Sequence, residues 1–245
     1  MVRGLFSCFG HLSSSFDGGT KRRFPHYYAT TATSYPTADE LIKGGPVVVE
    51  LFSSQGCATS REAEMLFTRL GRGDFELEVP VILMAYHVDY WDYNGWKDPF
   101  GSTQWTVRQK SYVESFNLDT TYTPQAKFRR PAPESLQISL TGSLRAKVDS
   151  KGADIMVSLF DSGLITDCRK GANQGRILPN DFVVRRLQKL CSVKDLSEKK
   201  TVTGTVDFKL WPGFSSSKCA MAVFIQQHGS RHIFGAQRFH LPENL

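Results

Sequence analysis

The sequence predicts an α/β protein, because strands and helices alternate in its first half and short strands dominate its second half. Residues 47–52 and 80–86 have the apolar composition of buried strands, and residues 60–70 between them carry an amphipathic helical pattern. This order is typical of a βαβ unit with a parallel sheet. Beyond residue 131, short alternating apolar runs are separated by turn residues, which indicates a β-rich region.

Local patterns assign the elements of the first half in turn. The strand at 47–52 is apolar and β-branched except for Glu50, and the helix at 60–70 is followed by Gly71 and Gly73, which are typical of a helix end. The predicted elements are a disordered arm (1–38), a short helix (37–42), a strand (47–52), a helix (60–70), a strand (80–86), an aromatic and acidic loop (87–100) and a helix (105–116).

The second half, residues 131–245, is expected to form a separate β-rich domain. Its predicted strands are 136–140, 155–160, 201–210 and 220–226. Residues 182–190 fit either a strand or a helix, because a short apolar pattern does not separate the two.

Composition disfavours two classes of partner. The net charge is +6, but the only tight basic run is at residues 21–23, and no aromatic and basic ladder or zinc-ligand spacing accompanies it, so no nucleic-acid partner is expected. No apolar run reaches the length of a bilayer span, so no membrane span is expected. Five cysteines without pairwise spacing predict free thiols and a cytoplasmic location, with an organelle reached through a transit-like arm as the alternative.

Cys57 is the strongest candidate for chemistry, because it follows a buried strand and precedes the helix at 60–70. Unpaired amide donors and the helix dipole stabilise a thiolate there, and solvent access is expected. The chain reads Cys57-Ala58-Thr59-Ser60, so an exchange reaction would lack a local resolving cysteine. Ser60 is expected to cap the helix, or alternatively to donate a hydrogen bond to the thiolate. A structural alternative is that Cys57 is a small residue that fits a tight turn.

The loop after the second strand carries His87, Asp89 and Asp92 at the sheet edge where ligands of α/β proteins bind. His87 is expected to exchange protons with Cys57, and Asp89 to orient the His87 ring. One histidine and two carboxylates give only a weak zinc signal, so no metal is expected. The alternative, which the composition favours, is a structural loop whose aromatic residues cover the core.

Four segments together resemble a known family. ELFSSQGCATS, AYHVDYWDYNGWKDPF, YTPQ and GANQGRILPNDFVVRRL are similar to the DUF1223 proteins, an uncharacterised thioredoxin-like family, and especially to its plant members. The resemblance implies a thioredoxin-like domain over residues 39–130, with a cis proline, Pro124, beside the thiol. Thr123, Pro124, Asp89 and Trp91 are then expected to bind substrate. Bacterial members commonly carry a second motif cysteine and an export signal, which are not found here.

The resemblance also implies an antiparallel strand pair and a closing helix after the TPQ motif. Only eleven residues separate Pro124 from Leu136, and they include two prolines. We therefore expect a shortened chain, of the splice-product type, with reduced stability, in which the strand at 47–52 has unpaired amides at one edge unless the β-rich region supplies a substitute.

These observations favour a monothiol protein that exchanges thiols and disulfides through Cys57. The expected partners are protein thiols or disulfides, or glutathione, and no resident cofactor is expected unless glutathione serves as one. A thiol oxidoreductase is therefore the enzyme hypothesis. The alternatives are an inactive thioredoxin-fold binding module that uses the surface around residues 90–96, or a destabilised variant.

Overall fold

The computed structural model of the protein describes residues 46–77, 79–129, 143–144, 152–193, 200–201 and 204–241. The arm expected over residues 1–38, the helix expected over 37–42 and the strand expected over 136–140 lie outside the described residues, as does Cys8.

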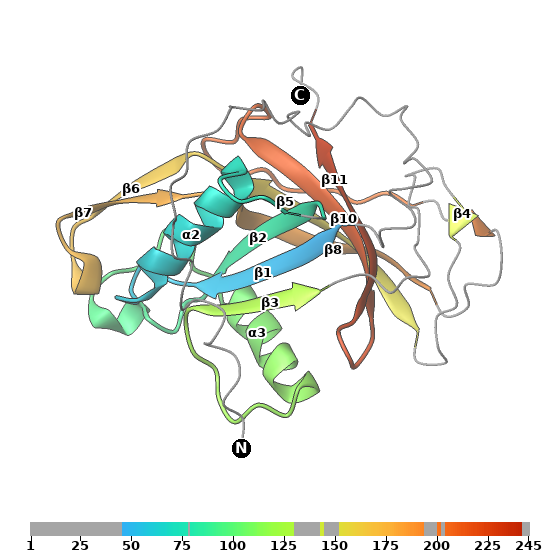
Figure 1. Ribbon diagram of the computed structural model, residues 1–245, viewed down its shortest axis with the longest axis horizontal. Coiled ribbons are helices and arrows are strands. Elements are labelled where there is room, and N and C mark those ends of the chain that lie inside the picture. The colour runs from blue at the N-terminus through green and yellow to red at the C-terminus, as the bar shows by residue number, and fades with distance from the viewer. Residues whose placement is uncertain are drawn as a thin grey trace.

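One large mixed sheet organises the described chain (Figure 1), which confirms the α/β prediction. Its seven strands run in the order β11-β10-β5-β8-β2-β1-β3. They are β1 (Val47–Ser53), β2 (Val81–His87), β3 (Gln125–Arg129), β5 (Ala153–Asp161), β8 (Val183–Val193), β10 (Cys219–Gln227) and β11 (Ile233–His240). β1 and β2 are parallel as predicted, β2 and β8 are also parallel, and the other neighbours are antiparallel.

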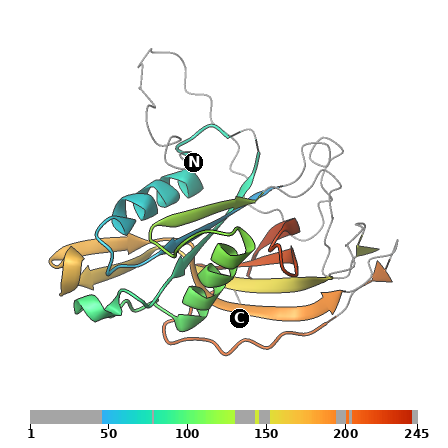
Figure 2. The same cartoon turned by 90° about the horizontal axis from the view of Figure 1, so that it is seen from below.

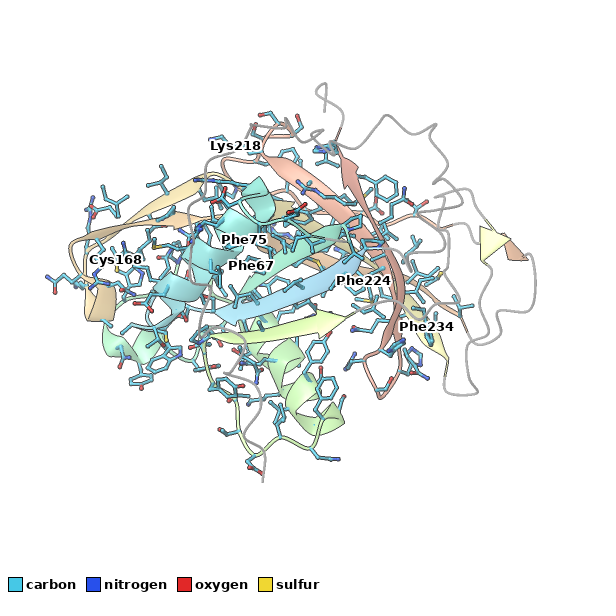
Figure 3. All side chains as sticks on the ribbon, viewed as in Figure 1. Phe67, Phe75, Cys168, Lys218, Phe224 and Phe234 are labelled. Atoms are coloured by element: carbon cyan, nitrogen blue, oxygen red, sulfur yellow. The ribbon has the colours of Figure 1, made fainter. Side chains whose placement is uncertain are left out.

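Short elements surround this sheet. Two strand pairs are β4 (Ser143–Leu144) with β9 (Lys200–Thr201), and β6 (Leu164–Cys168) with β7 (Arg176–Asn180). The β6–β7 hairpin extends beyond one end of the large sheet (Figure 1), and Cys168 lies on it (Figure 3). The helices are α2 (Ser60–Arg72) and α3 (Thr103–Ser115), with 3₁₀ turns at Asp92–Asn94 and Gly171–Asn173.

The two α-helices of the described residues cover opposite faces of the sheet (Figure 2). Side chains alternate between the faces of a strand, so neighbours in sequence contact different helices. Leu83 of β2 lies beside α2, where its Cδ1 is 3.1 Å from the position of a Cβ built on Gly71. Tyr86, which has the opposite parity, packs edge to face on Trp105 of α3 with ring centroids 5.1 Å apart.

The edge predicted to be missing is present. β3 pairs antiparallel with β1, in a register that runs from Val48 opposite Arg129 to Phe52 opposite Gln125. The expectation that the strand at 47–52 has unpaired amides at this edge is therefore wrong. The five residues directly after Pro124 suffice to form the hydrogen-bond ladder with β1. The prediction failed because the family resemblance led us to expect the pairing strand further along the chain.

The sheet continues across residue 130, where the sequence predicts a domain boundary. β2 and β8 pair at Ala85 and Val183, and the Ala85 amide donates a 2.7 Å hydrogen bond to the carbonyl of Phe182. Phe67 of α2 and Phe224 of β10 belong to one buried cluster (Figure 3). Both regions therefore contribute to one sheet and one core, and the division into domains stays a prediction.

Two assignments in the second half are settled. The ambiguous segment 182–190 lies almost wholly within strand β8. The strand expected over 201–210 is wrong for residues 204–210, which have no regular structure. Here the side chains of Arg186 and Gln188 donate to the carbonyls of Lys209 and Asp207, so side chains of β8 replace a backbone ladder.

A buried ion pair joins α3 to β1. Glu50 is fully buried, and its Oε1 accepts hydrogen bonds from Arg108 Nε at 2.9 Å and Arg108 Nη2 at 2.6 Å. Arg108 Nη1 also donates to Gln226 Oε1 at 3.1 Å, and the Tyr112 hydroxyl donates to Glu50 Oε2. The one charge in the strand at 47–52 therefore has a partner, as a buried carboxylate requires.

Candidate functional site

Cys57 lies in the turn that joins β1 to α2. Its amide donates a 3.1 Å hydrogen bond to the carbonyl of Ser54, and α2 begins three residues later at Ser60. The thiol is therefore located at a helix start, as the sequence predicts.

Polar groups surround the sulfur. Cys57 Sγ lies 3.3 Å from Thr59 Oγ1 and donates a 3.6 Å hydrogen bond to the carbonyl of Thr123. Burial raises the pKa of the Cys57 thiol, but hydrogen bonds with the side chains of Ser60, Thr123 and Thr59 outweigh it, so the pKa is lowered overall. The thiolate is thus favoured by hydrogen bonds to its charged form.

Ser60 does not cap the helix as expected. It is the first residue of α2, the N-cap position belongs to Thr59, and Thr59 makes no side-chain capping hydrogen bond. The Ser60 hydroxyl accepts a 3.4 Å hydrogen bond from the amide of Ser54 and lowers the pKa of Cys57. The position of Ser60 therefore agrees with its alternative role, which is to donate a hydrogen bond to the Cys57 thiolate.

The thiol is less accessible than the sequence suggests, because only 3% of Cys57 is exposed. Trp91 covers the turn: a Cβ built on Gly56 would lie 2.9 Å from Trp91 Cβ, so only glycine allows this approach. Trp91 Nε1 donates a 2.7 Å hydrogen bond to Thr123 Oγ1, which holds the indole over the turn. The expectation of direct solvent access is wrong, although the described hydrogen-bond partners of the sulfur, Thr59 and Thr123, are polar.

The peptide bond between Thr123 and Pro124 is cis, which confirms the prediction. The carbonyl of Thr123 is the group that accepts the hydrogen bond from the thiol. Gln109 of α3 holds the preceding residue, since its Nε2 donates a 2.8 Å hydrogen bond to the carbonyl of Tyr122. The Thr123-Pro124 segment therefore lies beside the Cys57 thiol, as the family resemblance predicts.

His87 contacts the carboxylates of Asp98 and Glu64. It is 1% exposed, its Nδ1 lies 2.8 Å from Asp98 Oδ2, and its Nε2 lies 3.7 Å from Glu64 Oε1. Burial lowers the pKa of His87, but the two carboxylates raise it more strongly, to about 9, so the ring is protonated at neutral pH. Among the described contacts of His87, none is to Cys57, so the structure does not bring the expected base and the thiol together.

Asp89 does not orient the His87 ring, so this expectation is wrong. Its carboxylate accepts hydrogen bonds from Thr103 and Thr106, both 2.5 Å long, at the start of α3. Asp98 lies beside the His87 ring, where Asp89 was expected. All three aspartates of the loop look alike in the sequence, and only the fold decides which one reaches His87.

Two residues that the sequence analysis missed fix the turn of Cys57. Asp98 Oδ2 accepts a 2.7 Å hydrogen bond from the Gln55 amide. Asn173, which lies in the GANQGRILPNDFVVRRL segment, donates to the carbonyls of Gln55 at 2.8 Å and Cys57 at 3.1 Å. The carbonyl side of the turn therefore faces Asn173, and the sulfur faces Thr123.

The other described cysteines are free, as predicted, and differ from Cys57. Burial raises the pKa of Cys168 and of Cys191, and it raises the pKa of Cys219 to about 12. Of the described cysteines, Cys57 alone has a lowered pKa. Cys168 and Cys219 are buried and Cys191 is partly exposed, and the raised pKa values of all three are those of unreactive thiols.

The described residues contain no group of three or more His, Cys, Asp or Glu side chains arranged to hold a metal ion. In the same part of the chain, no helix is both long and apolar enough to cross a membrane.

Sequence comparison identifies the family. A profile of the family described as "protein of unknown function (DUF1223)" matches residues 48–128 and 125–226, which together exceed half of the chain. The chain belongs to the DUF1223 family. This confirms the resemblance seen in its motifs. No curated protein sequence matches it.

One solved structure is similar to this DUF1223 chain. It is the crystal structure of a protein from Agrobacterium tumefaciens, with a TM-score of 0.54 and 22% sequence identity. The match covers 82% of this chain and 97% of that chain. At this identity the similarity supports the fold and carries no statement about activity.

Proposed function

We propose that Cys57 is a monothiol nucleophile in thiol–disulfide or glutathione-linked exchange, within a thioredoxin-like region of the chain. The observation that carries this proposal is the hydrogen-bonded sulfur at the start of α2, whose pKa is lowered although it is buried. The carbonyl of Thr123, before the cis proline Pro124, faces the same sulfur. A low thiol pKa is the property that distinguishes reactive from structural cysteines.

The proposed reaction has two steps. The Cys57 thiolate attacks one sulfur of a disulfide, a new S–S bond forms, and the other sulfur leaves as a thiolate. Because residue 60 is a serine, a thiol from solution, such as glutathione, attacks the mixed disulfide and releases Cys57 as a thiolate. Ser60 and Thr59 stabilise the thiolate at both stages through their hydrogen bonds.

Access to the sulfur requires a movement of the residues around it, because Cys57 is 3% exposed, and we propose that Trp91, which packs against the adjacent Gly56, is the residue that moves. The indole is held to the segment before Pro124 by a side-chain hydrogen bond, to Thr123 Oγ1. A displacement of the Trp91 ring breaks that bond and uncovers the sulfur, so the reaction rate includes an opening step.

The burial of the sulfur favours a second candidate, a binding module without turnover. In that case the exposed ring of Tyr93, stacked on the half-buried Trp91, holds a partner, and Cys57 is a structural residue of the turn.

The two candidates are separated by adduct formation. The intact protein is incubated with glutathione disulfide, and the modified cysteine is located by peptide mass spectrometry. Exchange predicts a glutathione adduct on Cys57 that dithiothreitol or glutathione removes, and its loss in Cys57→Ser but not in the control Cys191→Ser. If no disulfide reagent modifies Cys57 in the folded protein, the nucleophile proposal is wrong and the binding module is favoured.

Three finer expectations stay predictions: the plant-type membership, the shortening after the TPQ motif with its splice-type origin, and the cytoplasmic location.

A further inference from the structure

A stacked aromatic pair, the half-buried Trp91 and the exposed Tyr93, borders the turn of Cys57. Trp91 and Tyr93 stack with ring centroids 6.2 Å apart and an interplanar angle of 17°. Tyr93 is 78% exposed, more than any other large apolar side chain among the described residues. Exposed aromatic surface of this kind marks binding sites more often than isolated exposed side chains do.

The pair is connected to the sulfur through one residue. Trp91 Nε1 donates to Thr123 Oγ1 at 2.7 Å, and the carbonyl of Thr123 lies 3.6 Å from Cys57 Sγ. Tyr122, the residue before Thr123, is 38% exposed. A ligand group that binds to Trp91 and Tyr93 is therefore close to Thr123, whose carbonyl accepts the hydrogen bond from the Cys57 thiol.

Two buried polar atoms near the sulfur have no hydrogen-bond partner among the described residues: the Tyr90 hydroxyl and Gln109 Oε1. Burial raises the pKa of Tyr90, the charge of Cys57 raises it further, and Gln109 and Thr123 approach it closely enough to lower it. Neither Gln109 nor Thr123, however, forms a hydrogen bond of good geometry with the Tyr90 hydroxyl. Buried polar groups are rarely left unpaired, so a ligand with both a donor and an acceptor, such as a peptide backbone, fits this place.

Burial and hydrogen bonds are the main causes of the pKa shift of Cys57. The hydrogen-bond partners described for its sulfur, Thr59 and the carbonyl of Thr123, carry no charge. The nearby cation Arg61 lines a small hollow with Glu64 and Asn173, and Asn173 holds the carbonyl side of the turn. Glutathione carries two carboxylates, which Arg and Lys side chains bind most strongly through charge-assisted hydrogen bonds. The surroundings of the sulfur fit an uncharged aromatic group better than they fit glutathione.

We propose that the preferred substrate of Cys57 is a peptide disulfide with an aromatic side chain beside the cysteine, and that Trp91 and Tyr93 are the specificity-determining residues. This inference rests on the proposed function. Glutathione then acts as the thiol that releases the mixed disulfide and not as the recognised substrate. An aromatic pair contributes enough free energy to change a rate constant by about 2- to 10-fold.

The test uses three probes, each activated as a mixed disulfide with 2-thiopyridine, so that release of the pyridinethione gives the rate. The probes are N-acetyl-Trp-Cys-Gly amide, N-acetyl-Ala-Cys-Gly amide and glutathione. Each rate constant is divided by that of the same probe with free cysteine, which removes differences in intrinsic reactivity. Wild type is expected to prefer the Trp peptide over the other two by about 2- to 10-fold.

Two variants test whether the preference for the Trp peptide depends on Tyr93. Tyr93→Ala is expected to abolish it, and Ile177→Ala, which removes a side chain that is 68% exposed on β7, is expected to retain it. Equal rates of wild type with all three probes would overturn the aromatic preference and leave the proposed function intact. If Cys57 reacts with none of them, the proposed function itself fails.

Discussion

Replacement of Arg108 by methionine tests the buried ion pair that joins α3 to the strand carrying the Cys57 turn. Glu50 is fully buried, and two nitrogen atoms of Arg108 lie 2.6 and 2.9 Å from its Oε1. Arg108→Met leaves this carboxylate without its cation, and removal of one partner of a buried pair costs about 3–5 kcal/mol. Urea unfolding, followed by far-ultraviolet circular dichroism, measures the loss. With a slope of about 3 kcal/mol per molar urea, the midpoint is expected to fall by about 1 to 1.7 M.

A second substitution shows whether the unpaired charge causes the loss. Glu50→Gln combined with Arg108→Met removes both charges, so the double variant is expected to recover much of the free energy of unfolding. The control Arg72→Met removes an exposed charge at the end of α2 and is expected to change stability by less than about 0.5 kcal/mol. The reasoning is refuted if Arg108→Met is within about 1 kcal/mol of wild type, or if the double variant is as unstable as the single one.

Two further predictions concern stability. The pKa of His87 is raised to about 9 in the folded state, so its protonation stabilises the fold fully below about pH 6.5, and this stabilisation of about 3 kcal/mol is lost as the pH rises through about 9. The difference in urea midpoint between wild type and His87→Gln should shrink over this range, and a constant difference would contradict the prediction. Gly71→Ala would place a Cβ 2.2 Å from Phe182 Cζ, so overpacking of about 1–3 kcal/mol should exceed the gain of about 1 kcal/mol in helix propensity. Thermal unfolding should show a lower midpoint that Phe182→Leu partly restores, whereas a higher midpoint in Gly71→Ala would argue against the contact.

The sequence was most informative where one local pattern decides the structure. The buried-strand composition of residues 47–52 and 80–86 and the apolar stripe of 60–70 correspond to β1, β2 and α2. It was least informative about β3, because five residues around Ala126 contain no strand pattern that stands out from their neighbours. Their partner, β1, decides their conformation through the ladder.

For the site, position along the chain was predictable but partners were not. The place of Cys57 at a helix start followed from the order of elements, and the cis bond before Pro124 followed from the family resemblance. The pairing of His87 with Asp98 in place of Asp89 depends on how the loop folds back over β2. The contacts of Trp91 with Gly56 and Thr123, on either side of Cys57 in the fold, join distant segments, which no local pattern encodes.

The central claim is that hydrogen bonds at the start of α2 make Cys57 a more acidic thiol than its burial alone would allow. The rate of iodoacetamide alkylation at Cys57, measured against pH by mass spectrometry, tests this claim most directly. The account predicts a pKa below that of an ordinary cysteine, which rises when Ser60 is replaced by alanine. A pKa at or above the ordinary value, unchanged in Ser60→Ala, would contradict it.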